Sequence, residues 1–191
     1  HVLTSKEALD LTEIPRSVLI VGGGVEGCEF ACLFSGLGSE VSVVEMMPTV
    51  LPLEDEVTIS TLTRELKKRK VQLFLNTQIT KWSAVDGGVR ATLDSGEELV
   101  ADTMLISVGR RMNSGQLGLD TVGVNLGTKG EILVNEKLET SVPGIYAIGD
   151  VTGKSMLAHV ASAQGKVAAS NAMGQSQCIN YDVIPAGIFT L

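Results

Sequence analysis

The chain has 191 residues, of which 44% are hydrophobic, and its formal net charge is −7. This length and composition suffice for one large domain or two small ones with a buried core. The negative charge argues against nucleic acid and against an anionic membrane as partners, because either would select for a basic surface.

No apolar stretch is long enough to span a membrane, and the first residues lack the pattern of an export signal, so we expect a cytoplasmic, reducing location. The three cysteines, Cys28, Cys32 and Cys178, match neither a disulfide framework nor a zinc site, and no metal site is predicted. Cys28 and Cys32 lie one turn apart in an apolar predicted helix. This spacing favours core packing over a redox pair.

Residues 1–15 are predicted to be a lead-in connection. Thr4 or Ser5 can cap a short helix that runs through Leu9, and Pro15 marks the entry into the first strand.

Residues 18–45 have the pattern of a dinucleotide-binding βαβ unit. An apolar strand, 18–21, is followed by glycines in the spacing G-x-G-x-x-G: Gly22, Gly24 and Gly27. These glycines permit a tight turn and let the backbone approach a pyrophosphate. The helix that follows, to about Leu37, points its free N–H groups at that phosphate.

An acid ends the second strand of this unit. Glu45 follows strand 41–44, where a carboxylate can accept hydrogen bonds from ribose hydroxyls. The same charge repels a 2′-phosphate, and the next residues, Met46, Met47 and Pro48, bring no base to hold one. The pattern therefore predicts NAD rather than NADP.

The next segment completes half of a parallel sheet. Residues 46–53 contain two prolines and are predicted to be a loop, after which three acids open a crossover helix. Apolar residues at helical spacing give this helix one buried stripe: Ile59, Leu62 and Leu66. A third parallel strand is predicted over 71–75.

From residue 78 to residue 108 the pattern changes to short β-like runs. Two hairpin signals, at 86–88 and 94–96, predict an antiparallel meander, which leads into a strand over 103–108 that returns to the parallel sheet. Gly109 ends that strand. It is expected either to border the nucleotide crevice or to form a turn before Arg110 and Arg111.

A change in composition near Arg111 predicts a boundary between a first domain, 16–110, and a second part, 111–191. In the second part, strands are predicted over 131–140 and 145–148, and the last helix is predicted to start near Met156 and to continue through residues 161–172. Asp150 follows a predicted strand and precedes this helix. Such an acid either serves a second nucleotide site or caps a turn.

Three motifs in this order resemble the flavin-dependent pyridine nucleotide-disulfide oxidoreductases. They are GGGVEGCE with the acid Glu45, ISVGRR, and GIYAIGD with SMLAH. The resemblance covers the whole chain, and the residues Met156 to His159 favour the branch that oxidises dihydrolipoamide. It implies an α/β fold: a three-layer, Rossmann-like NAD domain with an antiparallel meander, followed by the C-terminal, incomplete part of an FAD-binding domain.

The resemblance also implies two sets of cofactor contacts. The residues implied for NAD are Gly22, Gly24, Val25, Gly27, Glu29, Glu45, Ile79 and Gly109. The residues implied for FAD are Asp150, Met156, Leu157, Ala158 and His159. Among these, Glu29 resembles an acid near the nicotinamide and the flavin, Ile79 an apolar wall under the adenine, and Asp150 the ligand of the ribityl chain. The backbone around Ala158 would face the flavin O2. Glu26 departs from the pattern, because the family usually has an apolar residue there.

By the same resemblance, the redox cysteine pair would precede residue 1, and a dimer domain with a histidine–glutamate pair would follow residue 191. No catalytic residue is therefore expected in this chain. The parent is expected to be a homodimer that oxidises a small dithiol, and assembly into a 2-oxoacid dehydrogenase complex is one setting for it. The alternatives are another flavin disulfide or quinone reductase of the family, or a non-catalytic NAD-binding module.

Overall fold

The computed structural model describes residues 1–190, which form two compact units. The first unit comprises His1–Gly109 together with residues 188–190, and the second comprises Arg110–Gly187. The division after Gly109 lies beside the domain boundary expected from the sequence. Each unit is described by itself below.

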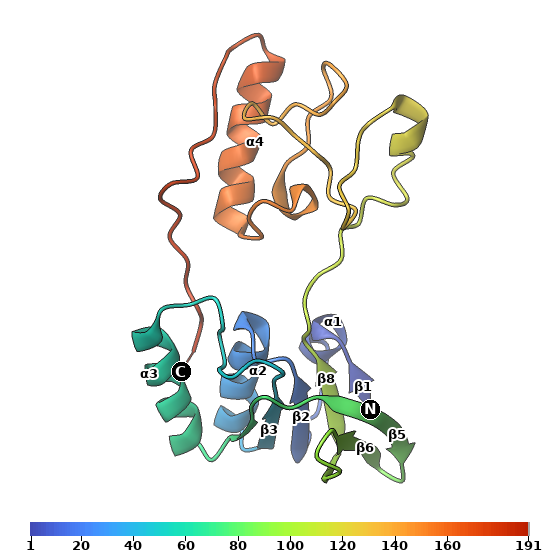
Figure 1. Ribbon diagram of the computed structural model, residues 1–191, viewed down its shortest axis with the longest axis vertical. Coiled ribbons are helices and arrows are strands. Elements are labelled where there is room, and N and C mark those ends of the chain that lie inside the picture. Colours follow the sequence, from blue (N-terminus) through green and yellow to red (C-terminus); the bar gives the residue numbers. More distant parts are fainter. Residues whose placement is uncertain (191) are drawn as a thin grey trace. The chain divides into compact units, whose positions relative to one another are not determined.

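A five-stranded parallel sheet is the centre of the first unit, with the strand order β1-β8-β2-β3-β4. The strands are β1 (Val2–Leu3), β2 (Ser17–Val21), β3 (Glu40–Val44), β4 (Gln72–Phe74) and β8 (Thr103–Ile106). The predicted strands are confirmed, but β1 was not predicted, because two residues are too few to show a periodic pattern. Strand β2 has β3 on one side and β8 on the other, so the strand order reverses at β2 (Figure 1).

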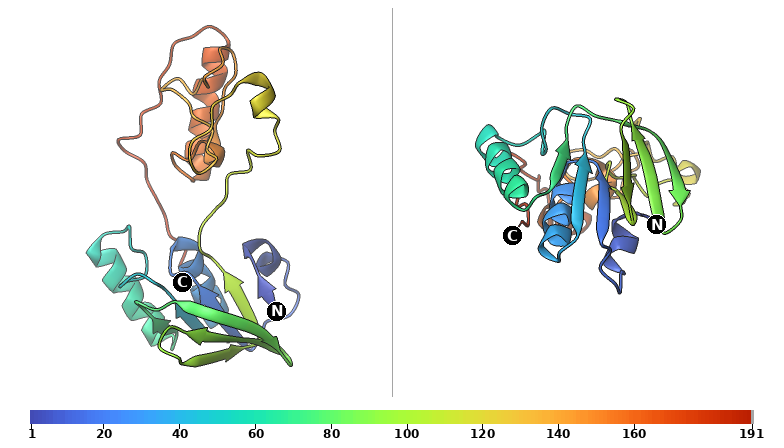
Figure 2. Two further views of the ribbon diagram at one scale, coloured as in Figure 1. Left: turned by 45° about the vertical axis from the view of Figure 1, so that its right-hand side comes forward. Right: turned by 90° about the horizontal axis from the view of Figure 1, so that it is seen from below.

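The parallel sheet is the middle of three layers (Figure 2). Helices α1 (Ser5–Leu9), α2 (Val25–Gly36) and α3 (Glu56–Lys68) cover one face, and their buried side chains share a core with Ile20 and Val43. The other face carries an antiparallel meander, β5 (Ile79–Val85), β6 (Gly88–Leu93) and β7 (Glu98–Ala101), which packs on Leu19 and Met104. The three-layer α/β fold with a meander is therefore confirmed.

The helix ends follow from local chemistry. Thr4 and Glu7 form the capping box of α1, which confirms the short predicted helix. Asp55 caps α3, because its carboxylate accepts hydrogen bonds from the N–H groups of Val57 and Thr58 at 3.0 Å each. Helix α2 ends at Gly36, as the glycines there predict.

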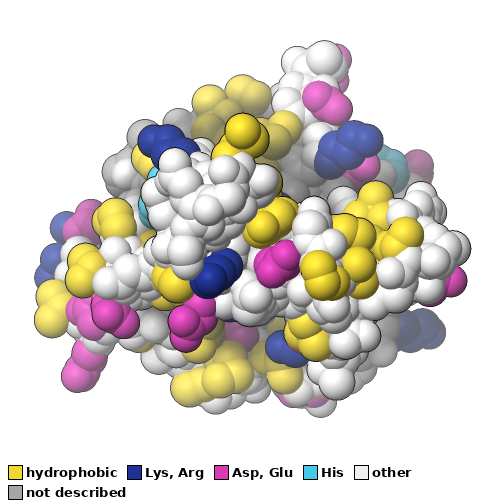
Figure 3. Space-filling view, turned by 90° about the horizontal axis from the view of Figure 1, so that it is seen from above, with side chains coloured by type: hydrophobic (Ala, Val, Ile, Leu, Met, Phe, Trp, Pro, Cys, Tyr) yellow, Lys and Arg dark blue, Asp and Glu magenta, His cyan; other side chains and the backbone are white. Residues whose placement is uncertain are grey.

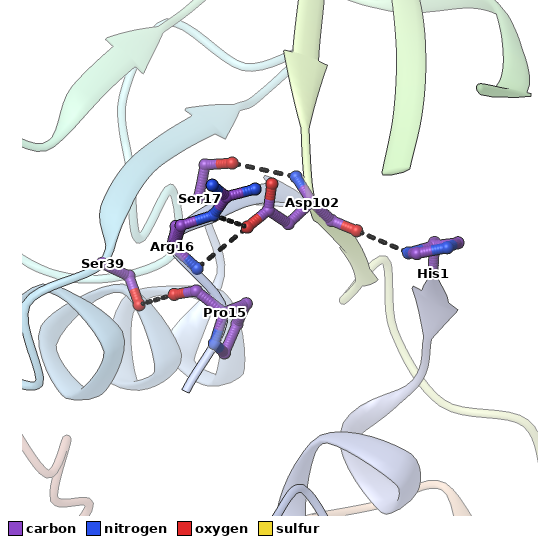
Figure 4. A network of polar contacts seen from close by, with 6 residues as sticks. All are labelled: His1, Pro15, Arg16, Ser17, Ser39 and Asp102. Atoms are coloured by element: carbon purple, nitrogen blue, oxygen red, sulfur yellow. Dashed lines mark hydrogen bonds and ion pairs between the residues drawn. The ribbon is translucent and has the colours of Figure 1, made fainter. Parts of the chain in front are cut away.

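Polar contacts tie the amino ends of β1, β8 and β2 together (Figure 4). The Asp102 carboxylate accepts hydrogen bonds from the backbone N–H and the Nε–H of Arg16 at 3.1 and 3.2 Å, and the bond from the Arg16 side chain lowers the pKa of Asp102. The Ser17 hydroxyl accepts the Asp102 N–H at 2.9 Å, and the His1 ring nitrogen contacts the Asp102 carbonyl. These bonds occupy the amino ends of the strands, whereas the carboxyl ends border a cavity.

The second unit has little regular secondary structure in the described residues 110–187. It contains the short 3₁₀ helices η1 (Leu119–Val122) and η2 (Gly149–Thr152) and one long helix, α4 (Ala158–Ala172). A small apolar core includes Val124, Ile132 and Ala147.

The prediction of strands over 131–140 and 145–148 is wrong. Within the described part of this unit, these segments form isolated bridges, one at Ile132 and one at Tyr146. Consecutive N–H groups there bond to separate segments instead of one partner strand: Ile132 donates to Val151, and Leu133 donates to Asn125. A strand needs one continuous ladder, which an apolar pattern alone cannot supply. Helix α4 starts at Ala158, two residues after the predicted start near Met156.

The distribution of charged side chains on the surface is consistent with the acidic composition. On the face drawn in Figure 3, Lys and Arg side chains lie in separate small groups among acidic and hydrophobic ones. No helix in the described part of the chain is long and apolar enough to cross a membrane.

Candidate dinucleotide-binding site

A cavity of about 460 Å³ lies at the carboxyl ends of the central strands of the first unit. Its lining includes Gly22, Gly24, Glu45, Ile79, Ser107 and Gly109. In open parallel sheets, ligands bind outside the carboxyl ends of the strands at the point where the strand order reverses, and this cavity has that location. Five residues selected from the sequence are thus brought together.

Two glycines of the loop are required by the fold itself. Gly22 has φ +106°, and a Cβ on it would collide with the carbonyl oxygen of Ser107. A Cβ on Gly27 would collide with the carbonyl oxygen of Gly22. The absence of these two side chains lets β2, α2 and the residues after β8 come into contact.

The fold itself does not require a glycine at position 24. Gly24 has an ordinary φ of −71°, and a Cβ on it would meet no protein atom within 4 Å. The space above it is open to the cavity. A bound pyrophosphate that approaches the backbone would use this space, so the residues present fit a dinucleotide.

Helix α2 begins directly at this open position. Gly24 is its N-cap and gives no side-chain hydrogen bond to the first turn, and the exposed Val25 is the first helical residue. The first N–H groups of a helix have no partner within the helix and carry partial positive charge. They are therefore suited to hold the negative oxygens of a phosphate.

Glu45 is fixed between two backbone N–H groups at the end of β3. The residue is 8% exposed, and its carboxylate accepts hydrogen bonds from Gly23 N–H at 2.6 Å and from Met47 N–H at 2.7 Å. Each of its two oxygens accepts one of these bonds. Because a carboxylate has about four acceptor positions, both oxygens can accept further bonds from ribose hydroxyls.

The loop after Glu45 also holds the glycine loop, which the sequence did not predict. Leu51 is 2% exposed and has φ +50°, unusual for a residue with a branched side chain, and its N–H donates to the Gly23 carbonyl at 2.8 Å. Val50 packs beside Gly23. Such strained backbone is common at functional sites. The only available signal was an apolar pair within a predicted loop.

On the other side of β2, Ser107 and Gly109 follow β8. Ser107 is 9% exposed and its hydroxyl donates to a Glu26 carboxylate oxygen at 3.2 Å. Gly109 has φ +117°, and a Cβ on it would meet nothing within 4 Å. Ser107 was missed, although the rule for strand ends that selected Gly109 also applies to it.

The structure does not bring Glu29 into the cavity lining. Its carboxylate accepts the N–H of Phe189 at 2.8 Å, in a separate hollow of about 270 Å³ that Phe30 and Leu33 also line. Ile188 packs against the core beside the helices.

The cysteines of α2 support the glycine loop through packing. Cys28 and Cys32 are free and buried, and the Cys28 thiol donates to the Gly23 carbonyl at 3.3 Å. Burial, and secondarily the nearby Cys32 and acidic groups, raises the pKa of Cys28 to about 12. Because a protonated, buried thiol is a poor nucleophile, these residues act as core side chains.

Thiol titration with a disulfide reagent at neutral pH is expected to modify one of the three cysteines in the native chain. Cys178 is exposed and should react quickly, whereas the thiols of α2 should react only in denaturant. A Cys178→Ser variant is the control, because it should leave no rapidly reacting thiol. Rapid modification of that variant at Cys28, located by peptide mass spectrometry, would contradict this assignment.

A second, larger hollow of about 620 Å³ lies at the amino ends of the strands and is lined by residues that include Ser17, Ser39 and Glu40. Two of its hydroxyls already serve the fold, since Ser17 accepts a backbone N–H and Ser39 donates to the Pro15 carbonyl. The cavity at the carboxyl ends is therefore the better candidate site.

In the second unit, the residues implied for FAD lie in η2 and at the start of α4. Asp150 has a side chain that is 48% exposed, and one of its oxygens lies 3.8 Å from an Arg110 nitrogen. Leu157 is the N-cap of α4 and provides no side-chain cap. Its neighbours are exposed: Met156, Ala158 and His159.

A buried amide that the sequence did not single out fixes η2 against α4. Gln164 is fully buried, accepts the Gly149 N–H at 2.5 Å, and donates to the Tyr181 hydroxyl at 2.9 Å. These bonds position the turn that carries Asp150. No signal in the sequence pointed to it, because α4 contains other polar residues, among them Ser162, Lys166 and Asn171.

Comparison with known proteins gives consistent matches. Residues 1–165 match the family described as pyridine nucleotide-disulphide oxidoreductase. Over 191 residues the chain is 40% identical to a dihydrolipoyl dehydrogenase from Chlamydia pneumoniae, and the match covers 100% of this chain and 41% of that protein. For a dihydrolipoyl dehydrogenase from Thermus scotoductus the identity is 38%, with 99% of this chain and 42% of that protein covered.

Solved structures give the same result. LpdA from Mycobacterium tuberculosis matches with a TM-score of 0.92 and 34% identity, covering 98% of this chain and 41% of that one. The HOCl-induced flavoprotein disulfide reductase RclA from Escherichia coli matches with a TM-score of 0.87 and 28% identity, covering 92% and 40%. The chain thus spans less than half of the length of these relatives.

Proposed function

The chain belongs to the pyridine nucleotide-disulphide oxidoreductase family, as its motifs predicted, and on this basis we propose that it is the NAD-binding part, with a portion of the FAD-binding part, of a dihydrolipoamide dehydrogenase. The parent enzyme would oxidise a dithiol to a disulfide and reduce NAD⁺ to NADH, with the electrons passing through a cysteine pair and FAD. The names of the relatives support the dithiol substrate. Another disulfide reductase is the alternative that the likeness to RclA supports.

The observation that carries the NAD assignment is the open position at Gly24 beside the fixed carboxylate of Glu45. A glycine that the fold does not need leaves room for a pyrophosphate at the start of α2. The carboxylate at the end of β3 then accepts the ribose hydroxyls, and its charge disfavours a 2′-phosphate.

The residues of the chain would bind and orient the cofactors. On the NAD side, the first turn of α2 holds the pyrophosphate and Ile79 provides an apolar surface beside Glu45 for the adenine. On the FAD side, the family resemblance implies that Asp150 would accept hydrogen bonds from the ribityl chain and that the first N–H groups of α4 would face the flavin O2. The bound cofactors supply the hydride chemistry, whereas the protein supplies position and charge.

Calorimetric titration of the chain with NADH and with NADPH tests the nucleotide assignment. NADH should bind at least about tenfold more tightly, which corresponds to about 1.4 kcal/mol, because repulsion between two unit charges about 4 Å apart is worth about 1 kcal/mol in water and about 4 kcal/mol near a protein surface. Equal affinities, or tighter binding of NADPH, would overturn the proposal for Glu45.

Two further expectations stay predictions. A homodimeric parent with a small dithiol substrate follows from the family resemblance, and a cytoplasmic location follows from the sequence pattern. Neither depends on the nucleotide site.

A further inference from the structure

Glu26 places a carboxylate at the carboxyl end of β8. It is the second residue of α2, it is half-buried, and its Oε1 accepts the Ser107 hydroxyl at 3.2 Å. Ser107 lies just beyond β8, and its own N–H donates to the Val21 carbonyl at 2.8 Å. Because its backbone continues the parallel sheet, Ser107 has a fixed position, and so does the hydroxyl that contacts Glu26.

The strand order tells which half of a dinucleotide this carboxylate would meet. A dinucleotide bound at the switch point places one nucleoside on each side of the glycine loop. Glu45 follows β3, so the adenosine ribose belongs on the β3 side. Strand β8 flanks β2 on the opposite side, so the nicotinamide half belongs above Ser107 and Gly109. The open space at Gly109 accommodates it.

The two redox states of the cofactor differ in charge at this half. The oxidised nicotinamide ring carries one positive charge and the reduced ring carries none, while the pyrophosphate carries the same charge in both. Glu26 itself does not line the cavity, but its carboxylate accepts the hydroxyl of Ser107, which does, so its charge lies next to this half and would attract the oxidised form selectively. We propose, building on the proposed function, that Glu26, positioned by Ser107, makes this site prefer NAD⁺ over NADH relative to a site without that charge.

A purely structural role of Glu26 makes a different prediction. An acid in the first turn of a helix stabilises the helix through its dipole. Removing such a charge would lower the melting temperature, or change both affinities by the same factor, and would leave their ratio unchanged. The ratio of the two dissociation constants therefore separates the two roles.

The test is calorimetric titration of the 191-residue chain with NAD⁺ and with NADH at low and at high salt. The Glu26→Gln variant keeps an acceptor oxygen for the Ser107 hydroxyl but removes the charge. Its ratio of Kd(NADH) to Kd(NAD⁺) should be about fivefold lower than that of the unchanged chain at low salt, and the difference should shrink at high salt. The Ser107→Ala variant should give an intermediate ratio, because the carboxylate remains but is no longer held.

The matched control is Glu40→Gln, an exposed acid at the amino end of β3, which changes the net charge equally but should leave the ratio unchanged. A ratio in Glu26→Gln within twofold of the unchanged chain, with both nucleotides bound, would refute the role of Glu26 and leave the proposed function intact. Failure of the unchanged chain to bind either nucleotide would refute the proposed function, and the role of Glu26 with it.

Discussion

Replacing Gly24 with alanine is expected to abolish tight nucleotide binding without unfolding the chain, whereas replacing Gly27 with alanine is expected to destabilise the fold itself. The two positions differ in what an added methyl group would meet. At Gly24 it meets no protein atom within 4 Å, and at Gly27 it collides with the carbonyl oxygen of Gly22. The missing side chain at Gly24 thus leaves space for the ligand, whereas the missing side chain at Gly27 avoids a collision within the folded chain.

The expected size of each effect follows from this difference. Gly24→Ala should lower the free energy of unfolding by no more than about 1 kcal/mol, the usual cost of alanine at an N-cap. Gly27→Ala should lower it by about 3 kcal/mol or more, because the backbone must move, and the better helix propensity of alanine returns only about 1 kcal/mol. The affinity of Gly24→Ala for NADH should fall by at least about tenfold, because the methyl group occupies the place of the pyrophosphate.

Urea unfolding and calorimetric titration with NADH measure the two effects separately. Gly38→Ala is a further control, because Gly38 has a positive φ but lies after α2, away from the cavity. It should lose stability through backbone strain and keep its affinity. Unchanged NADH affinity in Gly24→Ala would show that the pyrophosphate does not lie on this loop.

The unit from β2 to β3 could be predicted from the sequence because its signals are local. Apolar runs define the strands, glycines define the loop and the end of α2, and the structure gives the same elements with bounds that differ by about one residue. The meander was predicted for the same reason, because glycines mark both of its turns in the sequence. In the structure these glycines, Gly87 and Gly96, have positive φ.

The second unit shows where local signals fail. Residues 131–140 have the apolar content of a strand, but a strand also requires a neighbour that accepts a whole ladder of hydrogen bonds. In the structure Thr140 N–H bonds to the Ile145 carbonyl and Ala147 N–H to the Leu138 carbonyl, so the two segments pair only through one isolated antiparallel bridge, between Glu139 and Tyr146. Pairing of this kind depends on tertiary contacts that a sequence pattern does not encode.

The candidate site was predicted only in part for a similar reason. The sequence identified Glu45 as a ribose acceptor from its distance to the glycines, but not its two bonds to backbone N–H groups. The bond from Gly23 to Glu45, like the bond from Leu51 to Gly23 and the bond from Ser107 to Glu26, joins segments that are separated in the chain. These bonds are what gives the predicted residues fixed positions.

Glu45 therefore has two roles, and substituting it is expected to reveal both. Glu45→Ala leaves the N–H groups of Gly23 and Met47 without their charged acceptor. The Gly23 N–H is buried, and an unpaired buried donor costs about 1–3 kcal/mol, whereas the partly buried Met47 N–H can bond to water, so the free energy of unfolding should fall by about 2 kcal/mol. The glycine loop would also lose its main support, so NADH and NADPH should both bind weakly to this variant.

Glu45→Gln removes the charge in nearly the same volume, and the amide oxygen keeps one of the two bonds to backbone N–H groups. Without the carboxylate, a 2′-phosphate is no longer repelled, and the preference for NADH over NADPH should fall by about tenfold. The Glu40→Gln variant, at the other end of β3, should keep the original preference. If Glu45→Gln retained the full preference for NADH, the selectivity would have to come from the shape of the cavity rather than from this charge. Both variants are uncharged, but Glu45→Gln keeps the volume and one acceptor oxygen. Comparing Glu45→Gln with the unchanged chain therefore tests the charge, and comparing it with Glu45→Ala tests the support of the loop.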